Sequence, residues 1–398
     1  MRIGLRKVLP LIDGLIPLSE HAPATVAELS AIVKAARAAG HAVYPVGGRT
    51  MTAFGLPPTK PGVAVDLTRL NQVIDYPARD MTVTVQAGIR VAELQAVLAT
   101  ENQELPVDVP LPDRATLGGS IAVNASGPRR FGLGTLRDYV IGITLMNDEG
   151  EEFKAGGRVV KNVAGYDIMK LATGSLGTLG IITQVTLKVK PKAGASEWVA
   201  FPCLNNDLPP LFTDFVTHTR TRPAAAVYMS RDPERTIFVC FEDNPAAVAW
   251  QIAQLREELP RVPTDRLTVL TPEEGESRRA ALRDFPLSES HPITFKANFV
   301  PTAAAQFVRR YHAPGPVQAL IGSGVVYGHL PGVEAIPALT EAIDKLGGNV
   351  VLFRCPREAK TLARVWGRPT GDLDLMRAVK KALDPQNIFN PGRFVGGI

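Results

Sequence analysis

The sequence has few of the side chains that build disulfides, metal centres or self-contained catalytic sites. Its 398 residues include three cysteines, Cys203, Cys240 and Cys355, which lie far apart and form no CxxC pair. This spacing excludes a disulfide framework and an iron–sulfur site, and it predicts reduced, buried thiols. The six histidines form no H-x-H, H-E-x-x-H or triad-like pattern, so we expect no metal site.

Charge of one sign and long apolar runs are also scarce. A net charge of +5, without a dominant basic block, fits an anionic ligand and argues against nucleic acid. The apolar run Val8–Ile12 ends at Asp13, which is too short for the core of a signal peptide, and no stretch reaches the length of a membrane span. We therefore expect a cytoplasmic protein, and any association with a membrane would come through a partner.

The length is sufficient for two or three domains with substantial cores. In the first half, Thr25 and Glu28 form a capping-box pattern that opens a helix ending at Gly40. The expected elements that follow are strands at 42–44, 63–67 and 82–85, a helix at 91–100, and strands at 140–146 and 180–189.

The pattern changes after Pro191. Strand and helix signals then follow the order β-α-β-β-α-β between 197 and 270, and the same order recurs between 293 and 353. Two ferredoxin-like halves side by side predict a broad antiparallel sheet with helices on one face, and a last helix is expected at 372–383. The fold class is thus α+β, divided into residues 1–193, 194–370 and a C-terminal helix and tail, 371–398.

Three glycine-rich stretches dominate what the sequence does contain. They are residues 45–50 (PVGGRT), 116–124 (TLGGSIAVN) and 174–180 (GSLGTLG). Consecutive glycines let backbone N–H groups converge on an anion, and the small side chains let a ligand approach the backbone. Arg49, Thr50, Arg129 and Arg130 could add donors or positive charge. Three such stretches predict one large anionic ligand.

Each stretch also has a simpler interpretation. The first could be a glycine turn after a strand, the second a Gly/Ala-rich helix start packed on a sheet, and the third a tight hairpin connection. None is a Walker motif or a G-x-G-x-x-G dinucleotide fingerprint.

The set and order of these motifs resemble the flavoprotein family with a PCMH-type FAD-binding domain, also called the vanillyl-alcohol-oxidase type. The resemblance implies that residues 45–50 hold the FAD pyrophosphate, that 116–124 approach the pyrophosphate and flavin, and that 174–183 contact the adenine half. It also implies that the ending 384–393 (DPQNIFNPGR) returns to the FAD domain.

The loops and the resemblance together predict the residues that contact FAD. They are Pro45, Val46, Gly47, Gly48, Arg49, Thr50, Met51, Pro112, Asp113, Thr116, Leu117, Gly118, Gly119, Ala122, Asn124, Gly127, Arg129, Arg130, Asn162, Tyr166, Asp167, Gly174, Gly177, Gly180, Ile181, Ile182 and Arg393. No His or Cys lies in the first glycine loop, so the FAD is expected to be non-covalent.

Within that family, residues 126–130, 161–167 and 174–177 are similar to the FAD-binding subunits of bacterial glycolate oxidases. That resemblance implies a 2-hydroxy acid substrate, with a catalytic flavin subunit and an iron–sulfur subunit as partners that pass electrons toward the membrane quinone pool. In the chemistry expected, hydride leaves the substrate α-carbon for the flavin while a base takes the hydroxyl proton.

Catalytic residues are harder to assign. The catalytic relatives carry Gly-His-x-Gly-Asp-Gly-Asn-x-His on a cap strand, whereas here Gly328-His329 is followed by Leu330-Pro331-Gly332. Relatives also usually have Glu at the position of Leu176. His329 is a weak candidate, with a packed or surface histidine favoured, and Arg129, Arg130 and Arg354 are weak candidates for binding a carboxylate. Three functions stay open: an enzyme subunit, a non-catalytic FAD-binding or assembly subunit, and a stand-alone oxidase.

Overall fold

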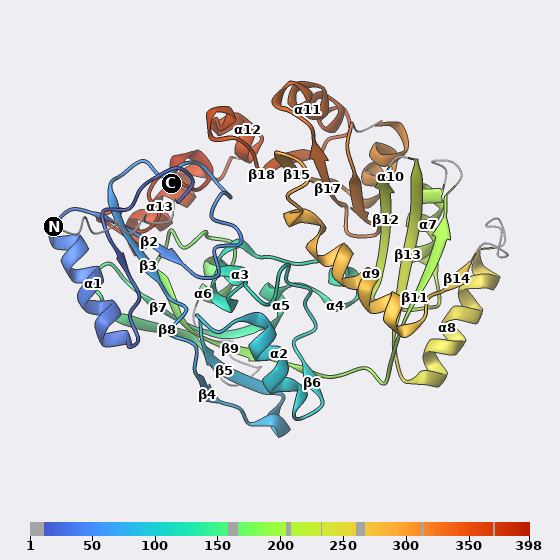
Figure 1. Cartoon of the computed structure of the whole chain (residues 1–398), viewed down its shortest axis with the longest axis horizontal. Helices are drawn as coiled ribbons and strands as arrows, with labels where there is room; N and C mark the ends of the chain where they lie inside the picture. The colour runs from blue at the N-terminus through green and yellow to red at the C-terminus, as the bar shows by residue number, and fades with distance from the viewer. Residues whose placement is uncertain are drawn as a thin grey trace, which may run out of the picture.

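The computed structural model describes residues 12–157, 166–203, 208–231, 233–259, 267–311, 314–368 and 371–398. Three larger sheets organise these described ranges, with one further sheet of only two strands (Figure 1). Two smaller sheets and their helices lie at the N-terminal end, on the left of the view, and one large sheet lies opposite them. The α+β class expected from the sequence is confirmed.

The first sheet is parallel and has three strands in the order β1-β3-β2. Helix α1 packs on it through Leu29, Val33 and Ala36, and the side chain of Thr25 caps the helix by accepting from the N–H of Glu28, as the capping-box pattern predicts. The elements are β1 (Glu20–His21), α1 (Val26–Ala38), β2 (Ala42–Val46) and β3 (Gly62–Asp66).

The second sheet is antiparallel and has five strands in the order β4-β5-β9-β7-β8. Its core side chains alternate along β5 and β9, where Val83, Val85, Val185 and Leu187 are fully buried. The elements around this sheet are β4 (Val73–Asp75), β5 (Thr82–Gln86), α2 (Val91–Ala99), β6 (Gln103–Glu104), α3 (Leu117–Val123), α4 (Arg130–Leu133), α5 (Leu136–Tyr139), β7 (Val140–Met146), β8 (Glu152–Gly156), α6 (Ile168–Ala172), β9 (Ile181–Lys188) and β10 (Lys190–Pro191).

The third sheet is antiparallel and has eight strands in the order β14-β11-β13-β12-β16-β17-β15-β18. Its strands and helices follow the two predicted β-α-β-β-α-β runs and meet where β12 pairs with β16. The elements are β11 (Ala195–Pro202), α7 (Leu208–His218), β12 (Ala225–Arg231), β13 (Glu234–Asp243), α8 (Pro245–Glu258), β14 (Thr268–Val269), α9 (Pro272–Asp284), β15 (Ile293–Asn298), α10 (Pro301–Arg310), β16 (Val317–Leu320), β17 (Val325–Leu330), α11 (Ile336–Asp344) and β18 (Asn349–Arg354).

The two faces of the eight-stranded sheet are covered differently. Helices α7, α8, α10 and α11 pack on one face and enclose a large apolar core. Helix α9, which the sequence did not predict, covers part of the other face, where Leu282 and the following Phe285 pack among residues of β11, β12 and β13. The part of this face formed by β15, β17 and β18 instead faces the glycine loops, and that placement creates the site.

The C-terminal segment returns to the first sheet, as the motif at 384–393 predicts. After α12 (Leu362–Trp366) and α13 (Leu373–Leu383), the N–H of Val43 donates to Ile388 O at 2.7 Å and the N–H of Asn390 donates to Val43 O at 3.1 Å. The buried Lys380 ammonium fixes this tail by donating to Asp384, Phe389 O and Thr178 O. We keep the division at residues 193 and 370 as a proposal, supported by the placement of the sheets.

Candidate functional site

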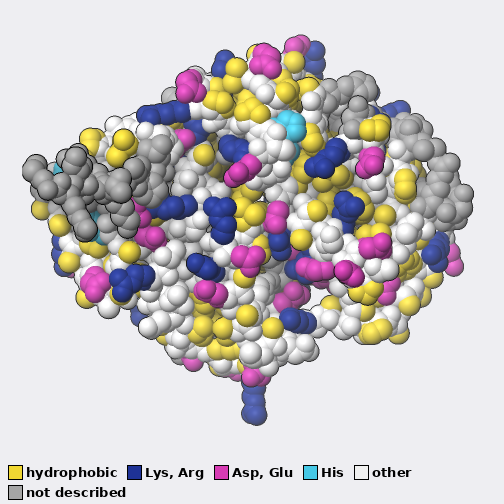
Figure 2. All heavy atoms as spheres, in the orientation of Figure 1, with side chains coloured by type: hydrophobic (Ala, Val, Ile, Leu, Met, Phe, Trp, Pro, Cys, Tyr) yellow, Lys and Arg dark blue, Asp and Glu magenta, His cyan; other side chains and the backbone are white. Residues whose placement is uncertain are grey.

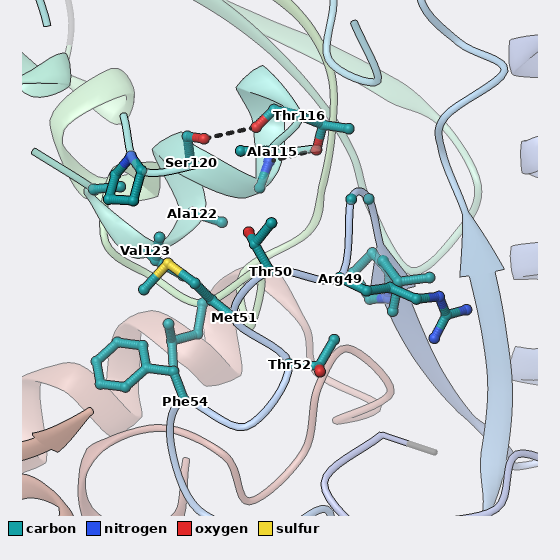
Figure 3. A pocket seen from close by; sticks show the side chains of 18 of the residues that line it. Arg49, Thr50, Met51, Thr52, Phe54, Ala115, Thr116, Ser120, Ala122 and Val123 are labelled. Atoms are coloured by element: carbon teal, nitrogen blue, oxygen red, sulfur yellow. Dashed lines mark hydrogen bonds between the residues drawn. The ribbon is translucent and has the colours of Figure 1, made fainter. Parts of the chain in front are cut away.

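The first two glycine stretches face each other across a cavity of about 770 Å³, which we call the loop cavity. The first stretch follows β2, and the second forms the start of α3. In Figure 3, Thr50 and Met51 extend from the first loop toward Ala122 and Val123 of α3. The lining residues are Ile12, Pro45, Val46, Gly47, Gly48, Arg49, Thr50, Met51, Thr52, Phe54, Val109, Pro110, Ala115, Thr116, Gly119, Ser120, Ala122, Val123, Ala125, Leu176, Asn390 and Arg393.

Several of these glycines are required by the packing of the chain itself. A Cβ atom on Gly47 would lie 2.0 Å from Thr116 Oγ1, one on Gly48 would lie 1.6 Å from Arg114 O, and one on Gly118 would lie 2.7 Å from Ala87 Cβ. The first loop therefore packs directly against residues 114–116. Glycines 47 and 48 are needed for this contact between the two loops, whether or not a ligand binds. Gly119 is different, because its Cβ would meet only Thr116 Oγ1, at 3.1 Å, and would otherwise project into open space.

The third glycine stretch closes the inner end of the site. The N–H of Gly174 donates to Ile121 O at 2.9 Å, and the N–H of Leu176 donates to Ala122 O at 2.8 Å, which fixes this stretch to α3. A further cavity of about 420 Å³, the deep cavity, lies beside it. Its lining residues are Pro45, Val46, Gly47, Leu67, Ala87, Thr116, Gly118, Gly119, Ala122, Leu176, Gly177, Gly180, Ile182 and Asn390.

A third cavity of about 770 Å³, the sheet cavity, opens from the outer end of the loop cavity. One wall belongs to the glycine loops and the other to β15, β17, β18 and α12. The lining residues are Met51, Phe54, Pro110, Val123, Asn124, Ala125, Ser126, Gly174, Pro286, Lys296, Asn298, Tyr327, Val351, Phe353 and Trp366. The loop cavity shares lining residues with each of the other two, and we call the three cavities together the glycine trough.

The backbone rather than Arg49 offers hydrogen-bond donors to the trough. In the parts of the chain that the structure describes, the N–H groups of Gly48, Arg49 and Thr50 have no acceptor. The guanidinium of Arg49 instead pairs with Glu20 at 2.9 Å and points away from the cavity (Figure 3). Loop N–H groups without acceptors form a concavity suited to a phosphate or another anion.

Arg393 holds the segment after the first glycine loop in place through hydrogen bonds. Its guanidinium, almost fully buried, donates to Thr52 O at 2.6 Å and to Phe54 O at 2.7 Å. Burial lowers the pKa of Arg393, with a smaller opposing contribution from Asp13. The residue lines the loop cavity, so its predicted proximity to the ligand fits the structure, while its hydrogen bonds fix the loop.

Arg129 does not lie where the sequence suggested. Its guanidinium is buried and contacts Asp108 at 3.0 Å, Glu242 at 3.0 Å and Glu104 at 3.6 Å. Burial opposes the charge of Arg129, but the three carboxylates raise its pKa overall. Arg129 lines none of the three cavities, and it connects the glycine-loop part of the chain to β13. The prediction that Arg129 binds the ligand or a substrate carboxylate is wrong.

His329 is a packed histidine. The side chain is 1% exposed, with Nδ1 3.1 Å from Thr294 Oγ1 and Nε2 3.0 Å from Phe285 O. Burial, together with the nearby His291 and Arg354, lowers the pKa of His329 to about 4 although the Phe285 bond opposes the shift. Both ring nitrogens have protein partners, so the weak catalytic assignment is not supported.

The other two arginine candidates lie beside the trough rather than in it. Arg354 donates to Ser288 O and, at 2.7 Å, to His291 O, so it fixes the segment before β15. Arg130 donates to Ser126 Oγ at 3.1 Å, and Ser126 lines the sheet cavity. Arg130 therefore acts on the trough only through its charge and through Ser126.

Most of the other predicted contacts do reach the trough. Those that line none of its three cavities are Pro112, Asp113, Leu117, Gly127, Tyr166, Asp167 and Ile181. Leu117 and Ile181 are core residues, Tyr166 is 94% exposed, and the side chain of Asp167 caps α6. Asn162 lies outside the described residues.

Lys296 is the main residue that the sequence did not single out. It lies on β15 directly opposite Tyr327 of β17, and both line the sheet cavity. Burial, with a smaller contribution from the charge of Arg130, lowers the pKa of Lys296 to about 8. Among the described residues, Lys296 Nζ has no hydrogen-bond or ion-pair partner. The alternation of apolar Ile293, Phe295 and Ala297 with polar Lys296 and Asn298 was the signal in the sequence.

No group of three or more His, Cys, Asp or Glu side chains in the described ranges is arranged to hold a metal ion. No helix in those ranges combines the length and the apolar character needed to cross a membrane. On the face shown in Figure 2, Lys and Arg side chains are interspersed with Asp and Glu, which matches the mild net charge.

Comparison with known proteins identifies the cofactor of this chain. Residues 18–156 match the family model described as "FAD binding domain", and residues 359–394 match "FAD linked oxidases, C-terminal domain". The chain thus carries an FAD-binding domain and part of the C-terminal domain of FAD-linked oxidases. The cofactor of this flavoprotein is FAD, and its family is one of FAD-dependent oxidoreductases.

The flavoprotein is similar to several curated proteins. It is 36% identical to the D-2-hydroxyglutarate dehydrogenase of Xanthomonas citri pv. viticola over 44% of this chain and 37% of that protein. It is 34% identical to the glycolate oxidase subunit GlcE of Escherichia coli over 38% of this chain and 43% of that protein. The matched part thus spans less than half the length of these two relatives. Identity to the glycolate oxidase subunit GlcD of Bacillus subtilis is 25% over 94% of this chain and 87% of that protein.

Solved structures agree on the fold. An alkyldihydroxyacetonephosphate synthase structure superimposes with a TM-score of 0.68, covering 94% of this chain and 76% of that one at 20% identity. At that identity, the likeness shows the fold alone.

The glycine trough fits FAD. The cofactor has a dianionic pyrophosphate between two flat ring systems, and the trough has acceptor-free N–H groups at Gly48–Thr50 between two cavities. Gly119 leaves the backbone of α3 open beside them. The N–H groups are suited to the pyrophosphate, and the cavities on either side leave room for the two ring systems.

Proposed function

We propose that this chain is the FAD-binding subunit of a 2-hydroxy acid dehydrogenase of the glycolate oxidase type. The observation that carries the proposal is Lys296, which lies on the wall of the trough opposite the glycine loops and has no partner among the described residues. A cation without a partner in a cofactor cavity suits a substrate carboxylate, because a charge-assisted hydrogen bond would then satisfy it. The names of relatives that act on D-2-hydroxyglutarate, glycolate and D-lactate support the same class.

The proposed cofactor contacts follow the trough. The pyrophosphate would meet the N–H groups of Gly48, Arg49 and Thr50 and the open backbone at Gly119. The adenine half would occupy the deep cavity beside Gly177, Gly180 and Ile182, and the flavin would lie between the loop and sheet cavities, where both are lined by Met51, Phe54, Pro110, Val123 and Ala125.

When bound, FAD supplies a two-electron acceptor for hydride from the substrate α-carbon. The chain's contribution is to bind and orient the substrate. Lys296 would hold the carboxylate, and the apolar walls from Phe54, Tyr327 and Phe353 would exclude water from the reacting face. Electrons would then pass to an iron–sulfur partner in the complex.

Anaerobic titration of the FAD-loaded chain with 2-hydroxy acids tests this proposal. We expect the flavin absorbance to bleach, and we expect Lys296→Met to raise the KM or half-saturation concentration about ten- to hundredfold, the equivalent of one charge-assisted hydrogen bond. Lys154→Met, at an exposed lysine on β8, serves as the control. Bleaching that is indifferent to Lys296→Met would contradict the assigned role.

A second function is favoured by one observation. His329 has no free ring nitrogen, so the residue aligned with the histidines of catalytic relatives cannot accept a proton without breaking a bond to Thr294 or Phe285. This fits a non-catalytic FAD-binding or assembly subunit, whose partners would be a catalytic flavin subunit and an iron–sulfur subunit.

Addition of the partner subunits separates the two functions. The assembly role predicts that the FAD-loaded chain alone is not reduced by any 2-hydroxy acid. Its flavin would be reduced only after a glycolate oxidase-type complex is assembled. We propose a cytoplasmic location with attachment to the inner membrane face through that complex. Cell fractionation with and without the partner genes tests this location.

A further inference from the structure

The sheet cavity carries information about the substrate beyond its carboxylate. It lies between the glycine loops and the exposed part of the eight-stranded sheet, and α9 and η3 (Phe285–Leu287) limit it on one side through Pro286. The cap side of the cavity is contributed by Pro286, Lys296, Asn298, Tyr327, Val351, Phe353 and Trp366. A substrate held against the cofactor must present its remaining atoms to this wall.

The charge on the wall matches one carboxylate. Among the residues that the structure describes, Lys296 is the only Lys or Arg that lines the cavity, and none of the described Asp or Glu residues lines it. Arg130 is close enough for its charge to affect Lys296, but it does not line the cavity, and its guanidinium donates to Ser126 Oγ. A second substrate carboxylate would therefore be desolvated without a cation of its own, which is strongly unfavourable in an apolar site.

Two buried polar atoms at the cavity also lack partners in the described chain. They are Asn124 Oδ1, an acceptor, and Trp366 Nε1, a donor. Buried polar atoms in native structures are normally satisfied, so this acceptor and donor indicate polar ligand groups rather than apolar packing. One acceptor and one donor beside a lysine match the hydroxyl and carboxylate of a 2-hydroxy acid or the polar edge of the flavin.

The rest of the wall is aromatic. The rings of Phe54 and Phe353 lie 4.6 Å apart, those of Phe54 and Trp366 5.2 Å, and those of Tyr327 and Phe353 6.0 Å. Val351 and Pro286 add further apolar surface. Edge-to-face and tilted clusters of this kind accept another flat apolar group, because each added ring finds both faces and edges to contact.

We propose that this site takes 2-hydroxy acids with one carboxylate and a flat apolar side chain of about phenyl size, in preference to glycolate or a dicarboxylate. The proposal rests on the proposed function for the position of the carboxylate at Lys296. The specificity-determining residues are Tyr327, Val351 and Phe353, which present the aromatic and apolar surface on the sheet side.

Binding of inert acids to the FAD-loaded chain tests the proposal without turnover. Titration calorimetry with 3-phenylpropanoate, acetate and glutarate should show 3-phenylpropanoate binding at least about 30-fold more tightly than either of the others, about the value of burying one phenyl group. Phe353→Ala should remove most of that ratio by weakening the binding of 3-phenylpropanoate. Val351→Phe, which fills the cavity and keeps its apolar character, should reduce 3-phenylpropanoate binding selectively. Leu375→Ala, at an exposed side chain of α13, is the control.

The outcomes distinguish the two proposals. Equal affinity for acetate and 3-phenylpropanoate, or tighter binding of glutarate, would overturn the proposed substrate class. If glycolate bleaches the flavin in the same preparation, the proposed dehydrogenase function would still hold. Preferential binding of 3-phenylpropanoate with no flavin reduction by 3-phenyllactate would support the ligand class and contradict the function. Absence of binding by every acid would overturn both.

Discussion

Replacement of Gly119 tests whether the glycine trough is the path of FAD. Gly119 lies in α3 and lines both the loop and the deep cavity. A Cβ atom there would meet only Thr116 Oγ1, at 3.1 Å, and the remainder of a leucine side chain would project into the trough. We therefore expect Gly119→Leu to block the cofactor rather than the fold.

The magnitudes follow from that geometry. Leucine in a helix interior is favoured over glycine by about 0.5–1 kcal/mol, and the close contact to Thr116 opposes this by a similar amount. The unfolding free energy of the apo chain should thus change by less than about 1 kcal/mol. A leucine side chain against the proposed pyrophosphate position should weaken FAD binding at least about 100-fold, or about 2.7 kcal/mol.

Gly48→Ala provides the contrast. Its Cβ would lie 1.6 Å from Arg114 O, a backbone atom that cannot move without separating the two loops. Overpacking of this kind costs about 1–3 kcal/mol or more, so Gly48→Ala should lose FAD together with stability. A bulky residue at Gly48 or Gly118 therefore reports on folding as much as on the site.

The assay combines FAD fluorescence titration with urea unfolding of the apo chain. Gly371→Leu is the matched control, because Gly371 is exposed and its Cβ would meet nothing within 4 Å. The reasoning is refuted if Gly119→Leu binds FAD with native affinity. A loss of FAD accompanied by several kcal/mol of lost stability would equally contradict the idea that Gly119 faces open space.

Three further predictions concern the buried charges. Arg129→Met should lower the unfolding free energy by about 3–5 kcal/mol in urea melts, because it leaves Asp108 and Glu242 buried beside one fewer cation; a change below about 1 kcal/mol would contradict the buried network. His329 has a pKa of about 4 in the folded chain and an ordinary pKa of about 6.5 in the unfolded chain, so the unfolded chain binds the proton first as the pH falls. The unfolding free energy should therefore fall by about 3 kcal/mol between pH 6.5 and 4. That loss should shrink in His329→Gln but not in the control His41→Gln. Because the pKa of Lys296 is lowered to about 8, binding of 3-phenylpropanoate should weaken by up to about tenfold for each pH unit above 8; a flat profile, or the same slope in Lys296→Met, would contradict the assigned contact.

Local sequence patterns predicted most of the fold. Helices such as α1 have a cap, an apolar stripe and a stop signal within a few turns of one another. A short stretch of sequence therefore contains all the signals that predict the helix. The two β-α-β-β-α-β runs were predicted for the same reason. Helix α9 was missed because it is strongly polar and has only two buried residues, Gly275 and Leu282, so its apolar stripe is weak.

The site was predictable only in part. The three glycine stretches were recognised because their small residues are consecutive in the chain. Arg129 was misassigned because its partners Asp108 and Glu242 lie 21 and 113 residues away. A basic side chain beside a glycine loop has the same appearance in the sequence whether it faces a ligand or a buried carboxylate.

The sequence by itself determined the class of fold, the three loops and, through the family resemblance, the cofactor. Each depends on spacing within a short segment, which propensity and periodicity can encode. Only the tertiary structure decided which glycines face the trough and which face another loop, and that Arg129 pairs with buried carboxylates and Arg354 with backbone carbonyls. It also placed Lys296 opposite the glycine loops. The physical reason is that burial and pairing of a charge depend on residues brought together from all three sheets, and no local window contains them.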